Sequence, residues 1–127
     1  MIVVDASAAV RALLHDGEAR RYLSAGSLVA PHLVDAEVMQ ALRRLVARGS
    51  VSETDAGRAV RQWSRLGLTR LAVDGLTSRI WSLRHNLSAY DASYAALAEA
   101  LDCPLLTADA RLAAAPGPSC PITVVPR

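Results

Sequence analysis

Short apolar runs alternate along this chain with longer segments of helical periodicity, and this alternation limits the possible folds more than any other feature. Five apolar runs predict strands, at residues 2–4, 28–30, 71–73, 104–107 and 122–125. Such alternation is typical of β-α-β units, in which parallel strands form a sheet that helices cover on both faces. We therefore expect an α/β fold of three layers with a short, mostly parallel sheet.

Helix start and stop signals divide the remaining sequence. Helices are predicted at residues 8–14, 18–23, 32–48, 53–66, 76–85, 88–101 and 108–114. Gly49 is a C-cap for the third of these helices, and Ser52 opens a capping box for the fourth. We expect this pair to form an αα-hairpin that projects from the sheet. No repeat or linker divides the 127 residues, which predicts a single domain over residues 1–127.

The composition argues against several classes of protein. All 14 residues in the Lys and Arg count are arginine, whereas Schiff-base enzymes, P-loop nucleotide hydrolases and kinases use a lysine. Cys103 and Cys120 have no zinc-ligand spacing to a histidine, so we expect two reduced thiols and no zinc site. No apolar run approaches the ~20 residues of a membrane span, and no signal peptide is evident. We expect a cytoplasmic protein without membrane association.

Acidic residues follow the predicted strands at the positions where parallel sheets bind ligands. Asp5 ends the first strand, and Asp109 lies two residues after the strand at 104–107. Asp91 lies in the first turn of the helix at 88–101. Each also has a structural interpretation, because Asp5 and Asp109 could be helix N-caps and Asp91 could complete a capping box with Ser88.

Glu37 lies beside the apolar stripe of the helix at 32–48, so its carboxylate faces the body of the domain and needs a partner. Asp35 points nearly the opposite way, which predicts a solvated side chain. Crowded carboxylates raise one another's pKa, and either arginines or divalent cations could offset their charge. An oxygen-only ligand set suits Mg²⁺ or Mn²⁺, and Mg²⁺ in such sites serves phosphoryl chemistry.

The order and spacing of these acids resemble a known family, the PIN-domain ribonucleases, and most closely the VapC-type toxins of toxin–antitoxin pairs. Four stretches carry the resemblance, namely Val3 to Ser7, Pro31 to Glu37, Tyr90 to Tyr94, and Leu106 to Asp109. The resemblance extends over nearly the whole chain.

The resemblance implies a catalytic metal site at Asp5, Glu37, Asp91 and Asp109, with one or two Mg²⁺ or Mn²⁺ ions, and supporting hydroxyls at Ser7 and Thr107. It implies cleavage of structured RNA, such as tRNA or ribosomal RNA, a homodimer, and silencing by a cognate VapB-type antitoxin. Some relatives have a fifth acid two residues after the fourth, where this chain has Arg111.

Arginines on the predicted hairpin are candidates for contacts to RNA phosphates. Arg58, Arg61 and Arg65 recur at i, i+3 and i+7 on one helix. Near the end of the preceding helix lie Arg43, Arg44 and Arg48, and the helix dipole could also explain Arg48. A solvated helix face is the alternative interpretation. Trp63 and Trp81 fit helical apolar rows, which predicts packing in the core or in an interface.

Two other functions remain open at this stage. The first is a catalytically inactive domain of the same fold that binds RNA or a protein. The second is a small phosphate-binding or phospho-acceptor domain, which the lack of lysine disfavours.

Overall fold

The computed structural model describes residues 1–126, and its centre is a parallel sheet of five strands. The strands are β1 (Ile2–Val4), β2 (Leu28–Pro31), β3 (Leu68–Leu71), β4 (Leu105–Thr107) and β5 (Ile122–Val124). Their order across the sheet is β3-β2-β1-β4-β5, and every neighbouring pair runs parallel. The expected α/β class with a short parallel sheet is confirmed.

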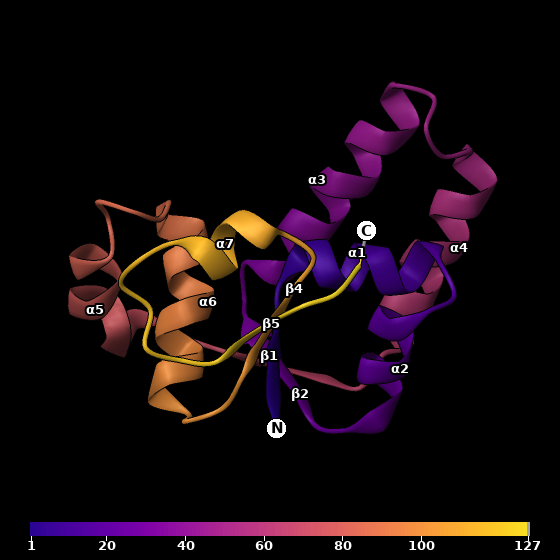
Figure 1. Ribbon diagram of the computed structural model, residues 1–127. Helices are drawn as coiled ribbons and strands as arrows, with labels where there is room; N and C mark the ends of the chain where they lie inside the picture. Colours follow the sequence, from indigo (N-terminus) through magenta and orange to yellow (C-terminus); the bar gives the residue numbers. More distant parts are fainter. Residues whose placement is uncertain (127) are drawn as a thin grey trace.

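Eight helical segments connect these strands. They are α1 (Ala6–Leu14), α2 (Glu18–Ala25), α3 (Val34–Ala47), α4 (Glu53–Arg65), the 3-10 turn η1 (Asp74–Leu76), α5 (Thr77–Ser82), α6 (Ala89–Ala100) and α7 (Ala110–Ala114). On one side of the sheet α1 packs against α2, α3 and α4, and on the other α6 packs against β1, β2 and β4 (Figure 1). The helices α3 and α4 extend beyond the sheet as the expected hairpin (Figure 1).

The core lies on both faces of β1 and β4. Val3, Val4, Leu105 and Leu106 have no exposed surface. Every residue of α6 from Ala92 to Ala98 is buried, because small alanine side chains let this helix approach the strands closely. That approach places the first turn of α6 beside the sheet edge where β1 and β4 end.

The predicted position of β3 was wrong, because the strand covers Leu68–Leu71 instead of residues 71–73. Its register pairs Leu68 with Leu28 and Arg70 with Ala30. As an edge strand it has one flank open to solvent, so only Leu68 is fully buried and the sequence shows no apolar run. The predicted helix at 76–85 was also too long, since η1 and the short α5 replace it.

Asp35 is solvated only in part, since 46% of its side chain is exposed, and it has partners that the sequence did not predict. Its carboxylate accepts hydrogen bonds from Trp63 Nε1 at 2.8 Å and from Arg70 at 2.7 and 3.0 Å. This contact joins α3, α4 and β3, and the Arg70 guanidinium also lies 5.5 Å from the Trp63 ring centroid. Helical periodicity placed Asp35 correctly on the face opposite Glu37, but α4 and β3 fold back onto that face.

The two tryptophans differ in their environments. Trp63 is 4% exposed and belongs to the core, as expected. Trp81 is 66% exposed, so core packing was wrong for this residue, and the Arg84 guanidinium stacks 4.6 Å from its ring centroid. Cys103 and Cys120 are both free thiols, as expected. Within residues 1–126 no helix is long and apolar enough to cross a membrane.

Candidate metal centre

The strand order places a switch point between β1 and β4, where the connections that follow the two strands leave in opposite directions. From β1 the sheet extends to β2 and β3 on one side and to β4 and β5 on the other. Connections that leave in opposite directions open a crevice at such a switch point, and α/β proteins bind ligands there. Asp5 directly follows β1 and Thr107 ends β4, so both predicted positions lie at this crevice.

Asp5 is fixed by donors from α1 and from β4. Its Oδ1 accepts from Ser7 Oγ at 2.7 Å and from the Ala8 backbone N–H at 2.9 Å, and its Oδ2 accepts from Thr107 Oγ1 at 2.5 Å. The bond from Ala8 makes Asp5 the N-cap of α1. The cap interpretation is therefore confirmed, and the same bonds aim the second carboxylate oxygen towards β4.

Ser7 and Thr107 form the hydroxyl support predicted for the acids. Their hydroxyl oxygens lie 3.1 Å apart, and Ser7 Oγ also accepts from the Ala108 backbone N–H. Thr107 Oγ1 accepts from the Asp109 backbone N–H at 3.0 Å. This small network joins the ends of β1 and β4 into one rigid unit.

The surroundings of Asp5 disfavour its negative charge. Burial raises the pKa of Asp5 above its ordinary value, and the nearby charge of Asp91 raises it further, whereas the bonds from Thr107, Ala8 and Ser7 lower it. The net direction is upward. A cation or a proton that neutralises a buried carboxylate with a raised pKa therefore lowers the free energy of the folded protein.

Glu37 has the partner that its position predicted. The Tyr94 hydroxyl of α6 donates to Glu37 Oε1 at 2.6 Å, and the Tyr94 side chain is buried. Burial raises the pKa of Glu37, and the charges of Asp91 and Asp5 add to that effect, while the Tyr94 bond opposes it. The sequence predicted the need for a partner but not its identity, because Tyr94 lies 57 residues further along the chain.

Asp91 lies in the first turn of α6, where Ser88 Oγ accepts from its backbone N–H at 3.1 Å. The capping interpretation is therefore confirmed for Ser88. Burial raises the pKa of the Asp91 carboxyl and the charge of Asp109 raises it too, whereas Arg111 acts in the opposite direction.

Asp109 is the N-cap of α7 and accepts from the Arg111 backbone N–H at 3.0 Å. Its carboxylate also pairs with the Arg111 guanidinium at 3.2 Å, and that arginine side chain is 90% exposed. Arg111 is thus the partner of Asp109 through both its backbone and its guanidinium.

The four acids lie within electrostatic reach of one another without forming a preassembled cage. The charge of Asp91 affects Asp5 and Glu37, and that of Asp109 affects Asp91. Among residues 1–126, however, no group of three or more acidic, histidine or cysteine side chains stands ready to hold a metal ion. Glu37 and Asp109 instead turn to Tyr94 and Arg111.

The donor chemistry of this crevice suits a hard divalent cation. All four candidate ligands are carboxylates, which Mg²⁺ and Mn²⁺ prefer. An ionised carboxylate has about four acceptor positions. At Asp5 three bonds use two of these positions on Oδ1 and one on Oδ2, which leaves Oδ2 able to accept one more partner.

The arginines proposed for RNA contact do not form one surface. Arg44 lines a hollow beside the crevice, whereas Arg43 lines another hollow on the far side of α3 together with Glu53. Arg58 is exposed and lies 3.6 Å from Asp55, and Arg61 and Arg65 are exposed on α4. Arg48 lines the same hollow as Arg44, and so does Arg11, which sequence reasoning missed.

Known proteins of one family match this chain over nearly all of its length. Residues 2–118 match the PIN domain family. Ribonuclease VapC9 of Mycobacterium tuberculosis and VapC ribonuclease Mb0985 of Mycobacterium bovis are each 58% identical over all of both chains. Ribonuclease VapC1 of Mycobacterium tuberculosis is 48% identical over 97% of this chain and 96% of its own.

Solved structures show the same fold. PAE2754 from Pyrobaculum aerophilum superposes with a TM-score of 0.72 at 27% identity, over 95% of this chain and 81% of its own. VapBC2 from Rickettsia felis, solved with a DNA fragment from its promoter, superposes with a TM-score of 0.66 at 17% identity. The match covers 98% of this chain and 99% of the other. The parallel sheet, the acids at its switch point and these matches agree, and the chain belongs to the PIN domain family, within which it is of the VapC type.

Proposed function

We propose that this chain is the toxin of a toxin–antitoxin pair and cleaves RNA as an endoribonuclease that depends on Mg²⁺ or Mn²⁺. The observation that carries the proposal is the set of four carboxylates around the switch point, with Asp5 held by Ser7 and Thr107. The ribonuclease names of relatives that are 58% and 48% identical support the same activity.

The proposed ligands are Asp5 and Asp91, with Glu37 and Asp109 completing the shell directly or through water. Asp5 offers the remaining acceptor position of Oδ2, and the network of Ser7 and Thr107 holds that oxygen in place. Glu37 would keep the Tyr94 bond on Oε1 and offer Oε2, whereas Asp109 would leave the Arg111 guanidinium. One or two ions are compatible with four carboxylates.

When bound, the divalent ion supplies a water of lowered pKa and offsets the negative charge that develops on the phosphate being cut. The four carboxylates would hold the ion and orient a water opposite the departing 3′-oxygen. The Tyr94 hydroxyl favours the ionised form of Glu37, because its hydrogen bond lowers the pKa that burial raises. The expected products have 5′-phosphate and 3′-hydroxyl ends.

The substrate and partners follow from the same proposal. We expect structured RNA, such as tRNA or ribosomal RNA, as the substrate, and a cytoplasmic site of action because that RNA is there. The VapC names of the relatives support a cognate VapB-type antitoxin as the inhibitor. A homodimer is the expected assembly of the free toxin.

Cleavage of total cellular RNA, with mapping of the new ends, tests the activity. Purified wild type should cut in Mg²⁺ or Mn²⁺, should stop in EDTA, and should resume when the metal is restored. Asp5→Asn should lose at least about a hundredfold in rate, since the change removes the charge that holds the metal. Asp74→Asn, on the exposed turn η1, is the matched control and should cut like wild type.

The second candidate is an inactive domain that binds RNA or a protein. It is favoured by one observation, that the carboxylates among residues 1–126 are not grouped as a ready metal site. If the wild type binds RNA but leaves it intact in both metals, this candidate replaces the nuclease.

A further inference from the structure

A groove runs between α1 and α3 beside the candidate metal centre. Its volume is about 470 Å³, within the range of about 300–1,000 Å³ that is usual for ligand sites. Both helices contribute residues at i, i+3, i+4 and i+7, a spacing that places them on one helix face. The α1 residues are Ser7, Val10, Arg11 and Leu14, and the α3 face contributes Ala41, Arg44, Leu45 and Arg48.

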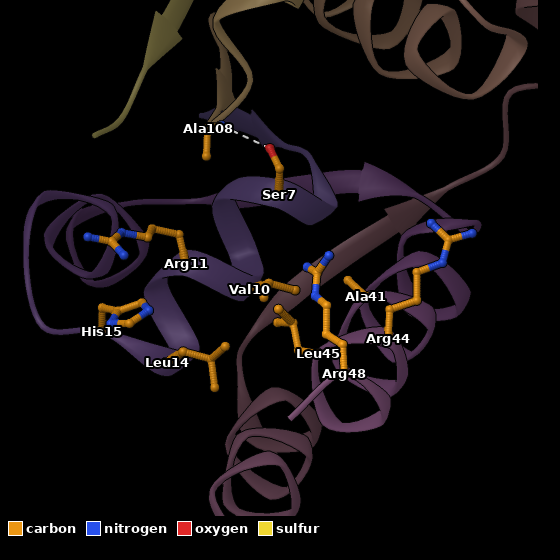
Figure 2. Close-up of a pocket in the computed structure, with 10 residues that line it drawn as sticks. All are labelled: Ser7, Val10, Arg11, Leu14, His15, Ala41, Arg44, Leu45, Arg48 and Ala108. Carbon is orange, nitrogen blue, oxygen red and sulfur yellow. Dashed lines mark hydrogen bonds between the residues drawn. The ribbon is translucent and has the colours of Figure 1, made fainter. Parts of the chain in front are cut away.

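Every ionisable side chain that lines the groove is basic. Arg11, Arg44, Arg48 and His15 line it, and no acidic residue does. Within residues 1–126 none of these three arginines forms an ion pair, whereas Arg58, Arg70, Arg79 and Arg111 each pair with a carboxylate. In Figure 2 the Arg48 guanidinium lies over the space between the helices, with Arg11 and Arg44 on either side. All three lie at the C-terminal ends of α1 and α3, where the helix dipole favours a cation, and their guanidinium groups have no carboxylate partner within residues 1–126.

The floor of the groove is apolar. Val10, Leu14 and Leu45 lie between the arginines, and Leu14 and Leu45 are only partly buried although they belong to the edge of the core. An apolar floor with cationic sides matches a nucleotide, which has a flat base and an anionic phosphate. Bases within a duplex are stacked and paired, so only an unpaired base could reach such a floor.

The groove is continuous with the crevice. Ser7 lines the groove and donates to Asp5 Oδ1, and Ala108 lines it and follows Thr107 directly (Figure 2). A strand whose phosphate lies at Asp5 would therefore pass into the groove with its neighbouring nucleotide.

We propose that this α1–α3 groove holds the RNA strand next to the phosphate that is cut. Arg48 and Arg44 bind backbone phosphates from α3, Arg11 binds from α1, and an unpaired base rests on Val10, Leu14 and Leu45. The proposal rests on the ribonuclease function above. It makes the groove, and not Arg58, Arg61 and Arg65 on α4, the main contact with RNA. An acidic protein segment is the other possible occupant, and the continuity with Asp5 favours RNA.

Binding measured without divalent metal separates this proposal from the nuclease function. Fluorescence anisotropy in EDTA would follow a labelled RNA hairpin with an unpaired loop, over a series of salt concentrations. The groove variant is Arg44→Glu with Arg48→Glu. Arg21→Glu with Arg84→Glu makes the same change of charge on α2 and beyond α5, outside the groove. Arg61→Glu with Arg65→Glu tests the stripe on α4.

The groove variant should raise the Kd about tenfold or more, and should lower the slope of log Kd against log salt by about 1.4, as expected for two lost phosphate contacts on a single strand. The control pair should leave both nearly unchanged. Leu45→Gln should weaken binding of the looped RNA without changing the salt slope, and a blunt duplex should bind equally to wild type and Leu45→Gln.

Two results would contradict the proposal that the groove binds RNA. One is a groove variant that binds and cuts RNA like wild type, which would leave the groove to a protein partner. The other is a larger loss from the α4 pair than from the groove pair. If the wild type binds through the groove and does not cut RNA in Mg²⁺ or Mn²⁺, the nuclease function fails and the groove stands. Circular dichroism of each variant confirms that it is folded.

Discussion

At the scale of single residues, Asp5 shows how one carboxylate serves folding and chemistry together. It caps α1 through Ala8, and it is held at the switch point by one hydroxyl from α1 and one from β4. The sequence predicted a helix N-cap and a metal ligand as alternative roles for Asp5. The structure confirms the N-cap and leaves the metal-ligand role as a proposal. The order of the four acids could be predicted from the sequence because strand ends and helix turns are local patterns. The contact of Glu37 with Tyr94 could not, since it depends on how α3 and α6 pack.

Asp5→Asn should make the metal-free protein less sensitive to pH. Because the folded-state pKa of Asp5 is raised, the folded state holds its proton more tightly than the unfolded chain does. This contribution to stability is present at low pH and is lost as pH rises through the folded-state pKa. Urea unfolding in EDTA from pH 3.5 to 7 should therefore show wild type losing stability relative to Asp5→Asn as pH rises. A relative gain with rising pH would contradict the account of Asp5.

Tyr94→Phe removes the donor that lowers the pKa of Glu37. The pKa of Glu37 should rise further, so the acid limb of the cleavage profile should move to higher pH. The free energy of unfolding should fall by about 1 kcal/mol through the lost hydrogen bond. Tyr90→Phe, at a side chain that is 64% exposed, is the control and should change neither. A cleavage profile in Tyr94→Phe that matches wild type would show that Glu37 does not limit the reaction.

At the scale of elements, apolar runs predicted four of the five strands and failed at β3, one of the two edge strands. β1 is apolar throughout and β4 is apolar up to its last residue, Thr107. β3 has Thr69 and Arg70 at its centre, because an edge strand with an open flank accepts polar residues. The α1–α3 groove was missed for a related reason, since helical periodicity identifies a face but not which helix packs against it.

Asp35 should stabilise the α3–α4 hairpin, because it receives bonds from Trp63 and Arg70. Asp35→Ala leaves the buried indole N–H without its acceptor and should cost about 1–3 kcal/mol of unfolding free energy. Arg58→Ala breaks an exposed pair and should cost about 0.5 kcal/mol or less. Denaturant unfolding of both variants measures the difference, and equal losses would show that the network contributes little.

The pH dependence of that network has the opposite sign to that of Asp5. The bonds from Arg70 hold the pKa of Asp35 below its ordinary value. Its contribution is therefore present above the ordinary aspartate pKa and is lost as pH falls through the lowered one. The advantage of wild type over Asp35→Ala should shrink in acid.

At the scale of the whole molecule, a formal charge of +2 conceals two different surfaces. When the four acids of the crevice are set apart, 8 of the 12 acidic residues remain against 14 arginines. Three arginines that form no ion pair within residues 1–126 line one groove beside the crevice. A near-neutral chain of this kind can therefore attract RNA to one side while a metal offsets the acids.

Metal binding should connect the acids, the stability and the chemistry. A cation that binds only the folded state raises the melting temperature, and the stabilisation grows with the logarithm of one plus its concentration divided by its Kd. Because protons compete for carboxylates whose pKa is raised, the affinity for Mn²⁺ should fall as pH is lowered from 7 to 5. An affinity that does not change over this range would indicate that other groups bind the ion.

The most direct test of the metal centre is calorimetric titration of metal-free protein with Mn²⁺ at pH 7. Wild type and the control Asp74→Asn should bind one or two ions, whereas Asp5→Asn and Asp91→Asn should bind at least about tenfold more weakly. The same Mn²⁺ affinity in Asp5→Asn, Asp91→Asn and wild type, or no binding by the wild type, would contradict the assignment of the four acids.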